Sequence, residues 1–140
     1  MASLIYLDTH VVAWLYAGGK AGLPEQAIRW LEEAEDIRIS PMVRLELQYL
    51  FEIGRVAQPA LPVVDAIETA LGLIICQASF AAVVREAEAH AWTRDPFDRL
   101  IVAQAALFHA PLLTKDGTIH ANYARALWPD GPVGTDLSPR

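Results

Sequence analysis

Short apolar segments alternate with longer amphipathic segments along most of the chain. The short segments at 3–7, 37–39, 73–76 and 112–114 are rich in branched side chains, which is typical of strands buried on both faces. A further short segment at 126–128 is expected to be an edge strand. The longer segments favour helices, expected at 10–17, 24–35, 40–53, 62–71, 79–92 and 95–109, with a short one after Gly117.

Strands that alternate with helices of this length are typical of a parallel sheet covered on both faces. The 140 residues correspond to the usual size of one domain. We therefore expect an α/β fold: a single three-layer α/β/α domain over residues 1–128, with a central parallel sheet of four to five short strands. The Pro/Gly-rich segment 129–140 is expected to be a flexible C-terminal tail. In such sheets the ligand site lies outside the carboxyl ends of the strands.

Composition excludes several classes of protein. Apolar residues make up 54% and charged residues 20%, which excludes a disordered chain, and the single cysteine, Cys76, excludes a disulfide framework. The N-terminus lacks the basic region of a signal peptide and the apolar runs are short for a bilayer, so a soluble cytoplasmic protein is expected. The net charge of −6 argues against broad charge-driven binding of nucleic acid, but not against a nuclease with a bound dication.

Three aspartates stand where the expected strands end or a helix begins. Asp8 directly follows the first strand, Asp116 follows the fourth, and Asp98 lies in the first turn of the helix that begins at Pro96. Each has a purely structural alternative, because a carboxylate caps a helix or is favoured by its dipole. We assign Asp95, directly before Pro96, to capping.

Glu46 lies within an expected helix, where capping does not explain it. Its neighbours three and four positions away are all apolar, so the side chain should point toward the core. Burying an ionised carboxylate without a partner costs on the order of several kcal/mol. Glu46 must therefore be neutral, paired or bound to a cation. The structural alternative is an ion pair with Arg94 or Arg99.

These four carboxylates form a stable ionised group only if a hard dication neutralises them. Oxygen ligands favour Mg²⁺ or Mn²⁺, and one or two such ions would activate a water for phosphodiester hydrolysis. Four neighbouring side chains are candidates for binding a phosphate or a metal-bound water: Thr9, Thr114, Arg99 and Lys115. A solvated surface role is the alternative for the two cations.

Four stretches in this order resemble PIN-domain proteins, specifically VapC-type toxins of bacterial and archaeal toxin–antitoxin pairs: YLDTHVVAWL, ISPMVRLELQYL, DPFDRLIVAQA and LLTKD. The resemblance extends from Ile5 to about Trp128. It implies a compact parallel-sheet domain that uses Mg²⁺ or Mn²⁺ to cleave single-stranded RNA, leaving a 5′-phosphate and a 3′-hydroxyl.

The resemblance also implies which residues act and which partners bind. The family's acidic positions carry over to Asp8, Glu46, Asp98 and Asp116, with Asp98 rather than Asp95 as the ligand within DPFDRLI. Typical members form homodimers and are silenced by a VapB-like antitoxin that inserts a segment, often basic, into the acidic groove. The acidic charge of this chain suits such a partner.

The sequence therefore predicts a metal-dependent endoribonuclease, with three alternatives. A phosphoacceptor receiver-like signalling domain also gathers acids at strand ends, but the usual acidic pair is missing at Leu7, Asp8 and Thr9. A phosphatase of the haloacid-dehalogenase type would need a second aspartate at position 10, which is His10. The third alternative is a non-catalytic PIN scaffold that only binds a partner.

Overall fold

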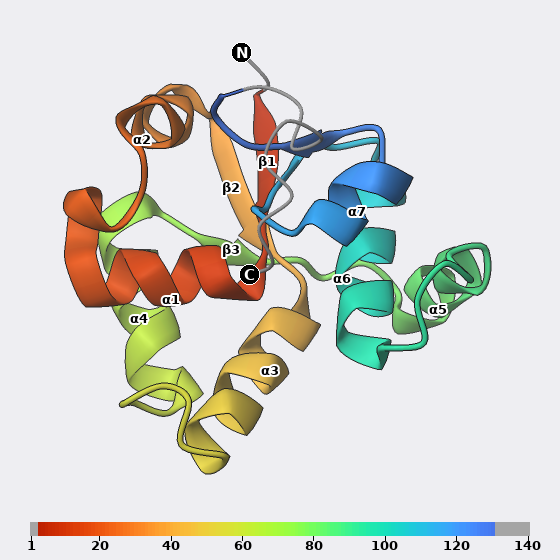
Figure 1. The fold of residues 1–140 in the computed structure, drawn as a ribbon, viewed down its shortest axis with the longest axis horizontal. Coiled ribbons are helices and arrows are strands. Elements are labelled where there is room, and N and C mark those ends of the chain that lie inside the picture. The colour runs from red at the N-terminus through yellow and green to blue at the C-terminus, as the bar shows by residue number, and fades with distance from the viewer. Residues whose placement is uncertain (1–2, 131–140) are drawn as a thin grey trace.

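The short apolar segments form one parallel sheet at the centre of the molecule. The computed structural model describes residues 3–130. All pairings between neighbouring strands are parallel, in the order β3-β2-β1-β4-β5 (Figure 1). The strands are β1 (Leu4–Leu7), β2 (Asp36–Ile39), β3 (Ile74–Ile75), β4 (Leu112–Leu113) and β5 (Ala126–Leu127). The expected parallel sheet is confirmed, with β5 as an edge strand.

Seven α-helices flank this sheet within the described residues, which confirms the α/β fold. The helices are α1 (Thr9–Gly18), α2 (Glu25–Glu33), α3 (Pro41–Glu52), α4 (Ala60–Leu71), α5 (Phe80–Glu88), α6 (Pro96–Ala106) and α7 (Gly117–Asn122), with a 3₁₀ turn, η1 (Gly19–Gly22), after α1. Side-chain caps begin several of them: the Ser40 hydroxyl accepts from the N–H of Met42 at the start of α3. Proline follows Ser40 at the first helical position, where a missing N–H costs nothing.

The central strand carries the most deeply buried part of the core. Ile5, Tyr6 and Leu7 are each at most 1% exposed, because helices cover both faces of the sheet at β1. Burying one such aliphatic side chain contributes about 1.5–3 kcal/mol to folding. This explains why β1 is a continuous apolar run rather than an alternating one.

Two helices end at least three residues earlier than the sequence pattern predicts. The expected helix 79–92 ends at Glu88, where the N–H groups of Ala89 and His90 bond to carbonyls three residues back. The expected helix 95–109 ends at Ala106, because His109 adopts the left-handed conformation at φ 51°. A residue in the left-handed conformation turns the chain so that N–H groups at the helix end can bond to the last carbonyls of the helix. Glycine usually occupies that position. No glycine marks either end, so neither helix end could be predicted from the residues around it.

The sheet topology brings two distant strand ends together. β1 pairs with β2 on one side and with β4 on the other, so the order of connections reverses at β1. The N–H of Asp8 bonds to the carbonyl of Leu113 at 3.0 Å, which places the residues after β1 beside those after β4. Ligand sites of open α/β sheets lie at such a reversal, outside the carboxyl ends of the strands.

Two expectations concern the ends of the chain and the membrane. Most of the expected tail, 131–140, lies outside the described residues, as does 1–2. Among residues 3–130, no helix has the length and apolar character needed to span a bilayer.

Candidate active site

Asp8 lies at the carboxyl end of β1 and is hydrogen-bonded through both carboxylate oxygens. Its Oδ1 accepts from the N–H of Thr9 at 2.8 Å, which caps α1, and its Oδ2 accepts from the hydroxyl of Thr114 at 2.6 Å. The residue is 1% exposed. Hydrogen bonds to a carboxylate are shorter and stronger than neutral ones, and two of them fix its orientation. Asp8 therefore does cap α1, as the structural alternative predicted. It also accepts a bond from Thr114, which capping does not require.

Glu46 points inward from α3, as its apolar neighbours predict. The residue is 8% exposed, and its Oε1 accepts from the hydroxyl of Thr9 at 2.5 Å. Thr9 is itself fully buried, at the first position of α1. This bond joins the start of α1, which Asp8 caps, to the middle of α3, which carries Glu46.

Asp116 belongs to the same connected group through Thr114. The Thr114 hydroxyl that donates to Asp8 also accepts from the N–H of Asp116 at 3.1 Å. The Oδ1 of Asp116 accepts from the N–H groups of Thr118 and Ile119 and caps α7, which is the structural role considered for it. Hydrogen bonds thus link Asp8 to Thr114 and Thr114 to Asp116 at the adjacent ends of β1 and β4.

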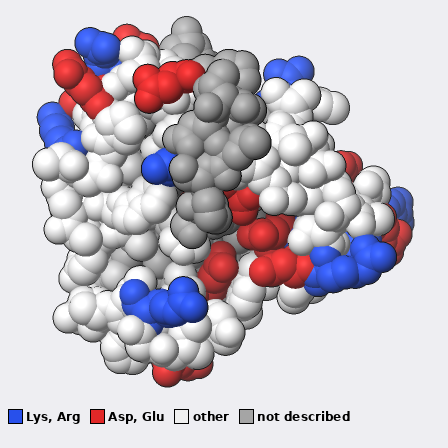
Figure 2. All heavy atoms as spheres, viewed as in Figure 1, with Lys and Arg blue, Asp and Glu red and all other residues white. Residues whose placement is uncertain are grey.

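Asp98 lies in the first turn of α6, a helix that packs against α3. The ring of the preceding residue, Phe97, lies 5.7 Å from that of Tyr49 on α3, and the hydroxyl of Ser40 donates to Gln104 of α6 at 3.0 Å. These contacts hold α6 against α3, the helix that carries Glu46. Figure 2 shows acidic side chains gathered at the centre of the view, where the starts of α3 and α6 face each other in Figure 1.

Asp95 and Asp98 have different environments. Asp95 is exposed and its Oδ1 accepts from the N–H groups of Phe97 and Asp98, so the expected capping role of Asp95 is confirmed. Asp98 is partly buried within the first turn. The cap therefore does not require the carboxylate of Asp98.

The two arginines considered near the site donate to backbone carbonyls beside α5. Arg99 donates to the carbonyls of Ala87 and Glu88, at 2.9 and 3.4 Å, and so satisfies the last turn of α5. Arg94 donates to the carbonyl of Ala91 at 2.7 Å. Lys115 is partly buried, and it lies between Thr114 and Asp116 in the sequence. Of the two cations suggested for phosphate binding, Lys115 is the one adjacent in sequence to the linked carboxylates.

Sequence reasoning missed one side chain beside the site. The Nε2 of His120 lies 2.7 Å from the carbonyl oxygen of Thr114, the residue that bonds to Asp8. The contact holds the turn after β4 against α7. Asp116 and His120 are four residues apart, a spacing that places both on one side of a helix, and this was the available signal.

The donor set has the chemistry that magnesium or manganese prefers. The linked groups present carboxylate and hydroxyl oxygens, which are hard donors, with no thiolate among them. Within residues 3–130, no three or more histidine, cysteine, aspartate or glutamate side chains are grouped as ligands of a single ion. Convergence of all four predicted carboxylates on one ion stays a prediction.

The chain matches a protein family and is similar to solved structures. The profile of the PIN domain matches residues 5–125, which is most of the chain. The fold is similar to the crystal structure of VapBC2 from Rickettsia felis bound to a DNA fragment from their promoter, with a TM-score of 0.58 at 20% sequence identity. That alignment covers 84% of this chain and 91% of the other.

At this identity the structural match supports the fold. No curated protein sequence matches the chain. The family rests on the profile, which spans the sheet from β1 to the residue before β5, including the strand ends that carry Asp8 and Asp116. The chain belongs to the PIN-domain family.

Proposed function

We propose that this protein is a metal-dependent endoribonuclease, and that it is the toxin of a VapBC-type toxin–antitoxin pair. One observation carries the proposal. Two buried carboxylates, Asp8 and Glu46, are each held by a buried threonine hydroxyl at the point where the sheet order reverses. Membership of the PIN-domain family and the similarity to VapBC2 support the same function.

Asp8, Glu46, Asp98 and Asp116 would hold one or two Mg²⁺ or Mn²⁺ ions. A bound dication supplies positive charge for the phosphate and an activated water for hydrolysis of the phosphodiester bond. Thr114 orients Asp8 and Thr9 orients Glu46, so each carboxylate keeps one direction before the ligand binds. Lys115 lies next to these groups in the chain, where its ammonium would contact the scissile phosphate.

The proposed partners follow from the acidic surface. The region between α3 and α6 gathers negative side chains, and the whole chain carries a net charge of −6 (Figure 2). A basic segment of a VapB-like antitoxin would bind there with favourable electrostatics and block the carboxylates. We also propose a homodimer, as in typical members of the family.

The proposed activity is tested with purified protein and single-stranded RNA. We expect cleavage with Mg²⁺ or Mn²⁺, no cleavage with a chelator, and products with a 5′-phosphate and a 3′-hydroxyl. Glu46→Gln and Asp98→Asn should each lower the rate by more than about 100-fold, the upper range for a lost metal-site group. Asp65→Asn and Glu68→Gln are the matched controls, because both carboxylates are exposed on α4.

Cleavage at the wild-type rate by both site variants would exclude this mechanism. Cleavage by neither the wild type nor the variants, with any single-stranded RNA, would favour the non-catalytic scaffold. A melting curve for each variant separates loss of activity from loss of the fold.

A further inference from the structure

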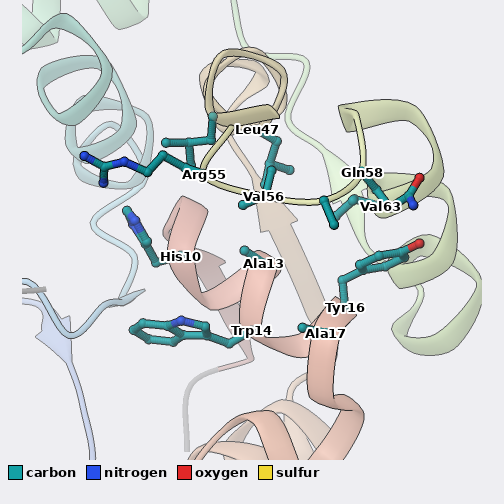
Figure 3. A pocket seen from close by; sticks show the side chains of 12 residues that line it. His10, Ala13, Trp14, Tyr16, Ala17, Leu47, Arg55, Val56, Gln58 and Val63 are labelled. Carbon is teal, nitrogen blue, oxygen red and sulfur yellow. The ribbon is translucent and has the colours of Figure 1, made fainter. Parts of the chain in front are cut away.

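A pocket lies between α1, α3, the start of α4 and the segment 55–58. Its volume is about 630 Å³, within the range of small-molecule and cofactor sites. Figure 3 shows His10, Trp14 and Tyr16 rising from α1 on one side and Arg55 and Gln58 on the other. The floor is formed by small and aliphatic side chains of α1 and α3, including Leu47.

Two residues that line the pocket are next in the chain to residues of the candidate active site. His10, which lines it, directly follows Thr9, and Leu47 directly follows Glu46. Thr9 and Glu46 are the pair joined by the 2.5 Å hydrogen bond. A polynucleotide whose phosphate lies at the carboxylates would therefore place a neighbouring nucleotide within reach of this pocket.

The pocket has the groups that a nucleotide requires. Tyr16 offers an exposed aromatic ring, on which a base of a single-stranded nucleic acid can stack. The Gln58 amide can donate and accept, as needed to read the edge of a base, and lies beside Tyr16 in Figure 3. The guanidinium of Arg55 lies at the opposite end, near His10.

Arg55 is important because the protein is acidic overall. Its side chain is exposed, and among residues 3–130 it makes no ion pair. Arginine is suited to phosphate through its forked donors. A basic protein segment would instead be repelled by this guanidinium, so the charge of the pocket favours a polyanion over the basic segment expected of an antitoxin.

We propose that this pocket binds the nucleotide next to the scissile phosphate of single-stranded RNA. The base stacks against Tyr16, Gln58 contacts its edge, and Arg55 pairs with the flanking phosphate. The inference rests on the proposed function, and it makes Gln58 and Tyr16 determinants of sequence preference rather than of catalysis.

The test measures binding rather than cleavage. A short fluorescein-labelled single-stranded RNA is titrated with protein in Ca²⁺ buffer and followed by fluorescence anisotropy, and a gel confirms that the RNA stays intact. Tyr16→Ala and Arg55→Ala should each weaken binding by at least about fivefold, the low end of one lost base-stacking contact. Arg85→Ala, an exposed arginine on α5, is the charge-matched control and should change binding by less than about twofold.

Gln58→Leu tests the base contact separately. We expect it to reduce the difference in affinity among RNAs that vary in one base, with little change in mean affinity. Melting curves establish that each variant is folded; Tyr16 and Arg55 are exposed, which makes their replacement compatible with the fold.

The two proposals fail in different ways. Unchanged RNA affinity in Tyr16→Ala and Arg55→Ala, or no RNA binding by the wild type, overturns the nucleotide pocket even if RNA is cleaved. Weakened binding in both variants without any cleavage by the wild type supports the pocket and overturns the nuclease. A basic peptide that binds the wild type, and fails to bind Tyr16→Ala while RNA still binds, assigns the pocket to a protein partner and contradicts the inference.

Discussion

The hydroxyl of Thr114 donates a 2.6 Å hydrogen bond to the carboxylate of Asp8, although 106 residues separate them in the chain. Both groups are buried, and they stand at the ends of adjacent parallel strands. The bond fixes the direction of a carboxylate that the proposed mechanism uses. Its removal should therefore affect catalysis more than folding.

Thr114→Val removes this hydroxyl and keeps the shape of the side chain. We expect the cleavage rate to fall by about 10- to 100-fold, the usual cost of losing an orienting group behind a metal ligand. The matched control is Thr69→Val on the exposed side of α4, which should leave the rate unchanged. Steady-state cleavage of a labelled RNA measures the rate of each variant. Equal rates for Thr114→Val and Thr69→Val would show that the Thr114 hydroxyl does not contribute to catalysis.

Thr9 should show the same dependence on its hydroxyl. Thr9→Val loses the bond to Glu46 and should lower kcat with little change in KM, whereas Thr9→Ser keeps the hydroxyl and should recover most of the rate. If Thr9 had a purely structural role, the kcat of each variant would instead fall in proportion to the decrease in its melting temperature. Comparing kcat with Tm across the two variants distinguishes these outcomes.

Asp95 and Asp98 should separate stability from activity. Asp95→Ala removes the cap of α6 and should cost about 1 kcal/mol of folding free energy with little loss of cleavage. Asp98→Asn keeps the cap and should abolish most of the cleavage with a smaller change in stability. Urea unfolding and RNA cleavage of the two variants check this, and the reverse pattern would exchange their roles.

The stability of the fold should decrease in strong alkali. Burial raises the pKa of Tyr123 from 10.0 to about 12, and its hydroxyl donates to the carbonyl of Ala110. Since the folded pKa lies above the unfolded one, this contribution to stability is complete below about pH 10 and is lost as the pH rises through about 12. Burial likewise raises the pKa of Tyr6, which adds to the effect.

The measurement is the free energy of unfolding in urea from about pH 9 to about pH 12. Tyr123→Phe should be less stable at the lower end by about 1 kcal/mol, the net value of one hydrogen bond, and should lose less stability as the pH rises. A parallel pH dependence for the wild type and Tyr123→Phe would contradict this assignment.

Gly22 should tolerate no side chain. A Cβ atom built there would overlap the backbone carbonyl of Trp14, so Gly22→Ala must move η1 away from α1. We expect a loss of about 1–3 kcal/mol, typical of overpacking. Gly18→Ala is the control, because a Cβ there meets nothing within 4 Å and alanine favours the helix. Equal stability of the two variants would contradict this.

The sequence pattern predicted the fold well where local signals were strong. Ser40 with Pro41, and Asp95 with Pro96, marked the starts of α3 and α6 correctly, because capping depends on residues close in the chain. The end of α6 could not be predicted, since His109 occupies the left-handed position where a glycine usually marks the end of a helix.

The inward direction of Glu46 could be predicted from helical spacing, but its contact with Thr9 could not. Contacts between elements depend on how helices pack on the sheet, which a periodic pattern does not specify. For the same reason the sequence suggested Arg99 for phosphate binding, whereas its guanidinium donates to carbonyls of α5. His120 was overlooked because its contact is to a backbone carbonyl, and the sequence offers only its four-residue spacing from Asp116 as a signal.

The central claim is that two buried carboxylates, Asp8 at the end of β1 and Glu46 in the middle of α3, bind a divalent cation. Calorimetric titration of Mn²⁺ into the wild type, Asp8→Asn and Glu46→Gln tests it directly, with Asp65→Asn as the exposed-carboxylate control and a melting curve for each protein. We predict heat of binding for the wild type and the control, and affinity lowered by at least about tenfold in both site variants. Equal Mn²⁺ affinity in all four proteins, or no binding by the folded wild type, would contradict the account.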